Sequence, residues 1–116
     1  MSLVEDLDSI LAPMGIMSFP DFYSGTDIDY IVYNSIVDSP DNFADDEPQC
    51  YVRSANVNLY VRKNREKKKK QLRRLLRAAD FSLGDTNEIY ESETGYTHYV
   101  VSVEDVINAD DSETEE

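Results

Sequence analysis

The run from Tyr51 to Val61 alternates cleanly between apolar and polar side chains. Successive side chains of a β-strand point to opposite faces of a sheet, so this strand would have one apolar and one polar face. The apolar positions are Ala55, Val57, Leu59 and Val61, and the polar-face positions are Ser54, Asn56, Asn58 and Tyr60. The pattern predicts a strand that belongs to a sheet with its core on one side.

Two other segments have the periodicity of amphipathic helices. Ser2 and Glu5 have the spacing of a capping box, and apolar residues follow at helical intervals until Pro13. This pattern predicts a helix over residues 3–13. A second helix is predicted over residues 64–79, and its buried stripe comprises Leu72, Leu75, Leu76 and Ala79.

Further strands are expected on both sides of the second helix. Aromatic and β-branched residues at 30–36 predict one strand, and 16–22 is a short apolar stretch that leaves room for another. Residues 82–91 and 96–103 predict two more, joined by a turn at 93–95. Because short loops connect the strands, we expect an α+β fold, with an antiparallel sheet of four to five strands and two helices packed on one face.

A chain of 116 residues has room for one domain, which we place at residues 1–105. Residues 106–116 are expected to form an acidic, disordered tail. The segment 38–48 has two prolines and five carboxylates and is expected to be a solvated loop. The single cysteine, Cys50, excludes an intrachain disulfide and is interpreted as a small buried hydrophobe. An acidic N-terminus and the absence of a long apolar run predict a soluble protein that starts in a cytoplasm, with no membrane partner.

Positive charge is concentrated in one window. Ten of the eleven Lys and Arg residues lie between Arg62 and Arg77, where only Glu66 opposes them, so the window has a net charge of +9. The remaining residues have one Arg and twenty-three carboxylates, a net charge of −22. This separation indicates electrostatic pairing, either with another molecule or between copies of the chain.

Three interpretations of the basic window remain open. It is a solvated face, or it binds nucleic acid, or it binds a protein partner that presents acidic groups. The surrounding negative charge would repel a phosphate backbone, so direct nucleic-acid binding is the least favoured. A protein partner is the most favoured, and the acidic loop of a neighbouring copy is one candidate. The interface candidates are Arg62, Lys63, Arg65, Lys67, Lys68, Lys69, Lys70 and Arg73 on the basic side, and Asp41, Asp45, Asp46 and Glu47 on the acidic side.

Residues typical of enzyme active sites are few. The four glycines are scattered and form no phosphate-binding loop, and one His with one Cys falls short of a metal site. His98 is expected on the strand face opposite Tyr99, and we interpret it as a structural residue beside Tyr96. We therefore expect a protein that is not an enzyme and that uses no cofactor.

Several segments, in order and spacing, match a known pattern. They are Leu3–Leu7, Pro13–Ile16, Phe22–Thr26, Tyr30–Tyr33, Phe43–Pro48, Val57–Asn64, Lys70–Leu76 and Thr94–Tyr99. Together they span roughly residues 1–103 and resemble the tail-terminator proteins (tail-completion, head-to-tail joining) of siphophages and related prophages. The entry to the second helix is more basic here than in the general pattern, so its role is not inferred from the family.

The resemblance implies two helices on an antiparallel sheet and a homo-oligomeric ring, usually a hexamer, that caps the tail tube. It implies three partners: further copies of the chain, the tail-tube protein and the head-connector (stopper) protein. The expected location is the virion tail, after assembly in the host cytoplasm, and no catalytic residues are implied. The rival hypothesis is a small acidic binding or regulatory module of prophage origin, such as an anti-repressor or a DNA mimic. The basic window argues against mimicry, because a mimic should be acidic over its whole working face.

Overall fold

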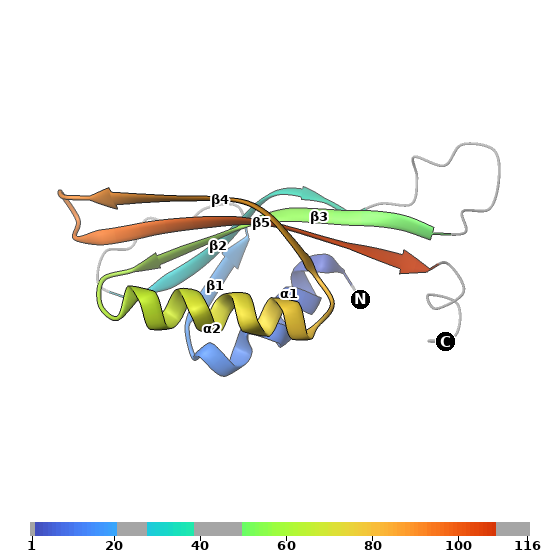
Figure 1. The fold of residues 1–116 in the computed structure, drawn as a ribbon, viewed down its shortest axis with the longest axis horizontal. Coiled ribbons are helices and arrows are strands. Elements are labelled where there is room, and N and C mark those ends of the chain that lie inside the picture. Colours follow the sequence, from blue (N-terminus) through green and yellow to red (C-terminus); the bar gives the residue numbers. More distant parts are fainter. Residues whose placement is uncertain (1, 21–27, 39–49, 109–116) are drawn as a thin grey trace.

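The computed structural model describes residues 2–20, 28–38 and 50–108. The elements, in chain order, are α1 (Leu3–Leu11), the 3-10 helix η1 (Ala12–Met14), β1 (Met17–Pro20), β2 (Tyr30–Val37), β3 (Cys50–Val61), α2 (Arg65–Ala78), β4 (Ser82–Glu91) and β5 (Tyr96–Asn108). Within the described ranges, neither α1 nor α2 is long and apolar enough to cross a membrane. The α+β class is confirmed, and both helices lie on the same side of the five-stranded sheet (Figure 1).

The core lies between the helices and the sheet. Helix α1 begins at the expected capping box, in which Ser2 Oγ accepts from the Glu5 backbone N–H and Glu5 Oε1 accepts from the Ser2 N–H. Its leucines Leu3, Leu7 and Leu11 meet Leu72 and Leu76 of α2 over the apolar face of β3 and β5. The sheet contributes Ile31, Tyr33, Ala55, Val57, Leu59, Val61, Tyr99, Val101 and Val103, so the predicted apolar face of β3 is confirmed.

The sheet is mixed, and in this respect the expected all-antiparallel arrangement is wrong. Its strand order is β1-β2-β3-β5-β4, and β1 runs parallel to β2, with Met17 beside Tyr30 and Phe19 beside Val32. The other three pairs are antiparallel. Apolar content identifies a strand but does not fix its direction, and a parallel neighbour needs a crossover rather than a hairpin.

The last strand is longer than the sequence pattern indicates. We expected it to end at residue 103, but β5 continues to Asn108 and pairs residues 104–108 with Cys50–Ser54 of β3. The expected boundary between domain and tail at 105/106 therefore falls inside a paired strand. Residues 109–116 of the expected tail, and all of the expected loop except Asp38, lie outside the described residues, as does the side chain of Cys50.

Arg53 stabilises the extended part of the strand. Its guanidinium is almost fully buried and forms a fork with Asp105, in which Nε lies 3.0 Å from Oδ1 and Nη2 lies 2.7 Å from Oδ2. Nη1 also donates to Asp6 Oδ2 of α1 at 2.7 Å. This ion triad joins β3, β5 and α1, and its two carboxylates hold the pKa of Arg53 above its ordinary value against the opposing effect of burial.

Candidate interaction surface

Helix α2 presents the basic window to solvent. The chain turns out of β3 at Asn64, which adopts the left-handed backbone conformation (φ 59°) and makes no side-chain cap. Leu72 and Leu76 then fix the orientation of the helix because both are fully buried against the core. Most of the remaining positions are Lys or Arg, and Lys70, Arg74 and Arg77 among them are exposed.

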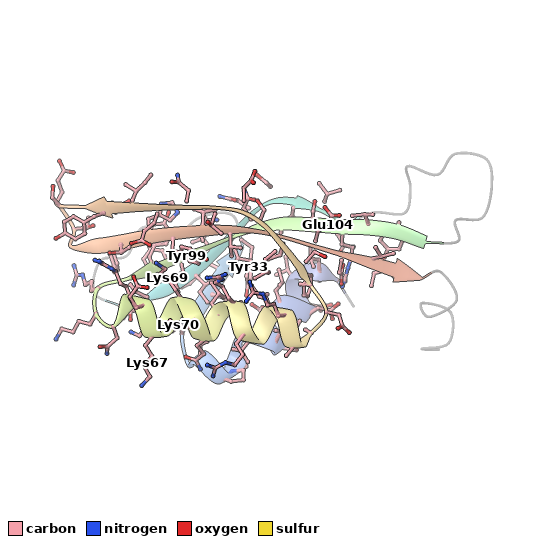
Figure 2. The ribbon with its side chains drawn as sticks, in the orientation of Figure 1. Tyr33, Lys67, Lys69, Lys70, Tyr99 and Glu104 are labelled. Atoms are coloured by element: carbon pink, nitrogen blue, oxygen red, sulfur yellow. The ribbon has the colours of Figure 1, made fainter. Side chains whose placement is uncertain are left out.

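Several cations of the basic window bind partners within the chain. They lie near the end of α2 that follows β3. Lys68 Nζ pairs with Asp29, just before β2, and Lys69 Nζ pairs with Glu88 of β4 and lies 5.2 Å from the centre of the Tyr99 ring. Figure 2 shows Lys69 near Tyr99, on the sheet side of the helix. The bond to Glu88 is the main cause of the raised pKa of the Lys69 ammonium. These two lysines fasten α2 to the sheet.

Arg62 and Arg65 also have partners within the chain. Arg62 donates from Nε and Nη2 to the Thr94 carbonyl oxygen at 3.2 and 2.9 Å, and its guanidinium lies 4.8 Å from the centre of the Tyr96 ring. Arg65 Nε lies 3.7 Å from Glu88, a looser and more exposed contact. Arg62 therefore binds the β4–β5 turn, and Arg65 contacts β4. Both residues had been predicted from the sequence as interface candidates.

Four cations farther along α2 form a different arrangement. Lys70, Arg73, Arg74 and Arg77 line a shallow surface groove of about 350 Å³, called here the cation groove. None of the four pairs with a carboxylate of the described residues, and Lys63 and Lys67 share this property. In Figure 2, Lys67 points away from the sheet.

The cation groove has the chemistry of an anion-binding surface. Lys70 and Arg74, and likewise Arg73 and Arg77, are four residues apart on the helix and repel each other at a cost of a few tenths of a kcal/mol per pair, about 0.2–0.5. An acidic ligand would remove this repulsion. Three of the four groups are guanidinium forks, which bind carboxylates through two parallel hydrogen bonds.

The structure thus divides the predicted interface residues. Arg62, Arg65, Lys68 and Lys69 bond within the chain, whereas Lys63, Lys67, Lys70 and Arg73 have no ion pair in the described part. The acidic candidates Asp41, Asp45, Asp46 and Glu47 lie outside the described residues. Arg74 and Arg77 were missing from the sequence-based set. A helical projection from Lys70 would have found them, because they follow it by four and seven residues.

His98 lies on the sheet face opposite the helices, as expected, and its nearest aromatic neighbour is Tyr60 rather than Tyr96. The two rings stack with their centres 4.1 Å apart, and His98 Nε2 lies 2.9 Å from the Asn58 Oδ1 acceptor. No group of three or more His, Cys, Asp or Glu side chains in the described ranges is arranged to hold a metal ion. His98 is thus packed and bonded as part of the sheet.

Half-burial of His98 predicts a pH dependence of stability. Burial lowers its pKa below the ordinary 6.5, and the charge of Glu91 offsets this only partly. The unfolded chain therefore binds the imidazole proton more readily than the folded chain does. The stabilisation that neutral His98 gives the folded state is complete above pH 6.5 and is lost as the pH falls toward the folded-state pKa. An NMR titration of the imidazole should show the low pKa, and His98→Gln should remove this part of the slope. A pKa at or above 6.5 would contradict the packing described.

A scan against protein-family models and a search of curated proteins each found no significant match.

Proposed function

We propose that this chain is a non-enzymatic assembly subunit of the tail-terminator type, which associates with copies of itself into a ring, of six by analogy with the family. The ring would cap a phage tail tube and present the surface that meets the head connector. The observation that carries the proposal is the cation groove, where four cations converge without a partner among the described residues. The resemblance over roughly residues 1–103 supports the tail-terminator assignment.

The groove favours an acidic protein surface as its partner. The chain has a net charge of −13, so a second copy offers abundant carboxylates, and Asp41, Asp45, Asp46 and Glu47 are the sequence-based candidates. A heterologous contact, in which the groove of one copy meets the acidic segment of the next, closes into a ring when the rotation between copies allows it. Nucleic acid is disfavoured as the ligand because the rest of the chain repels phosphate.

The test is the mass and shape of the purified full-length protein as salt is raised. The contact pairs opposite charges at the surface, so association should weaken between about 50 and about 500 mM salt, as the Debye length falls from roughly 14 to about 4 Å. Sedimentation velocity would measure the mass, and electron microscopy of negatively stained low-salt samples should show rings. A chain that stays monomeric at every concentration, alone and with isolated tail tubes, would overturn the proposal.

A further inference from the structure

The sheet face opposite the helices, called here the outer face, gathers most of the large apolar side chains that remain exposed. The strand register places five of them there: Met17, Val37, Val52, Ile89 and Val106. Their exposed fractions range from 46% for Val52 to 60% for Val106. Val52 of β3 and Val106 of β5 are direct cross-strand partners. Val37 of β2 is paired with Ser54, two residues along β3 from Val52. These five side chains lie in two groups: Val37, Val52 and Val106 toward one end of the sheet, and Met17 and Ile89 toward the other. Tyr30, Val32 and Tyr96, on the same face, are at most 5% exposed and are already packed within the chain.

The outer face also differs from the rest of the molecule in charge. Charged residues make up 30% of the chain. Among the described strand residues that the paired register places on this face, Glu91 and Glu104 are the only carboxylates, and none is Lys or Arg. Two further charged groups border the face: Asp85 in the bulge of β4, and the Arg62 guanidinium over the Tyr96 ring. In a chain with a net charge of −13, a surface with so few charged side chains lets the same face of two copies meet with little repulsion between facing groups.

Polar side chains in the middle of the outer face already have hydrogen-bond partners within the sheet. Asn58 Nδ2 donates to the Val32 carbonyl oxygen at 3.0 Å, and Ser102 Oγ donates to Asn56 Oδ1 at 2.9 Å. These groups keep their hydrogen bonds when water is removed, so covering the face leaves few polar atoms without partners.

We propose that the outer face packs against the outer face of a second copy, sheet on sheet, in a two-fold symmetric dimer. Such sheets pack about 10 Å apart, with the side chains of both inner layers interdigitating. The molecule measures 50 by 24 Å along its two longer axes, which leaves room for the ~800 Å² per partner that stable interfaces bury. This contact uses no residue of the cation groove, so it goes beyond the proposed function and stands or falls independently of it.

Two adjacent residues of β4 provide a matched test. Ile89 lies on the outer face beside His98, whereas Tyr90 pairs with Thr97 on the opposite face. The side chains of Ile89 and Tyr90 are both more than half exposed. A carboxylate at position 89 would be buried twice in the symmetric dimer. Ile89→Glu should therefore raise the dimer dissociation constant by about a hundredfold or more, while Tyr90→Glu leaves it within about threefold.

The experiment is sedimentation equilibrium in the Lys70→Glu/Arg74→Glu background, which removes the groove contact. Here association should strengthen with salt, because screening reduces the repulsion between two acidic chains, and this is the opposite of the salt effect expected for the groove. Loss of the dimer in Ile89→Glu alone supports the proposal, with circular dichroism confirming that both variants are folded. A protein that is monomeric at high salt and high concentration, or a dimer equally insensitive to both substitutions, overturns it.

Discussion

Replacing Arg53 with Ala should lower the free energy of unfolding by about 3 kcal/mol, toward the lower end of the cost of breaking a buried ion pair. The side chain of Arg53 is 4% exposed, and its removal leaves the carboxylates of Asp105 (14% exposed) and Asp6 (27% exposed) without their cation. The partial exposure of Asp6 gives that carboxylate access to water, so the cost stays below the upper end of the range. The loss also removes the ionic link between α1 and the β3–β5 pair, while Leu3, Leu7 and Leu11 still pack α1 against the core.

Urea unfolding followed by circular dichroism measures this change, and a fall of about 3 kcal/mol corresponds to a decrease of more than about 10 °C in Tm for a domain of this size. Arg74→Ala is the matched control, because Arg74 is exposed and has no ion pair in the described part of the chain. It should change stability by less than about 0.5 kcal/mol. Equal effects of the two substitutions would show that the triad does not contribute to stability.

Reversing two charges of the cation groove should abolish the groove-mediated self-association at low salt without unfolding the monomer. Lys70→Glu/Arg74→Glu places two carboxylates where the acidic partner is expected, and neither residue pairs within the described part of the chain. We expect the dissociation constant to rise by about a hundredfold or more, because an attraction at contact distance becomes a repulsion. The measurement is sedimentation velocity at low salt, with thermal unfolding to verify the fold.

The control for this prediction is Lys63→Glu, compared with the single substitution Arg74→Glu. Both positions are exposed cations without an ion pair in the described ranges, and only Arg74 lines the groove. A general effect of net charge would weaken association equally in the two variants. The groove contact predicts a clear loss for Arg74→Glu and little change for Lys63→Glu. Lys68 and Lys69 are unsuitable for this purpose, because their reversal would break the ion pairs with Asp29 and Glu88.

The sequence was sufficient where a local pattern determines the structure. The alternation through Tyr51–Val61 predicted the buried face of β3, and the Ser2–Glu5 spacing predicted the start of α1. The sequence was insufficient where contacts between residues far apart in the chain determine the structure. The extension of β5 to Asn108 includes Asp105, whose carboxylate binds Arg53 of β3, and nothing in residues 104–108 themselves reveals that partner.

The division of the basic window follows the same rule. Periodicity places the window on a helix, but only the fold brings Asp29, Glu88 and the Thr94 carbonyl oxygen to Lys68, Lys69 and Arg62, respectively. These partners lie 39, 19 and 32 residues away in the sequence. The cations that remain are those on the side of α2 for which no described element supplies an acid. A cluster of cations without acidic partners among the described residues is expected to have a functional role.

Mixing two complementary variants tests the contact between the groove and the acidic segment. Lys70→Glu/Arg74→Glu reverses the groove, and Asp45→Lys/Asp46→Lys reverses the candidate acidic segment, so each variant alone should sediment as a monomer at low salt. In an equimolar mixture every contact again joins opposite charges if the two variants alternate, an arrangement that closes in a ring with an even number of copies. If the groove binds the acidic segment of the next copy, the mixture recovers association. A mixture that remains monomeric, or a Lys70→Glu/Arg74→Glu variant that assembles as the parent does, would contradict it.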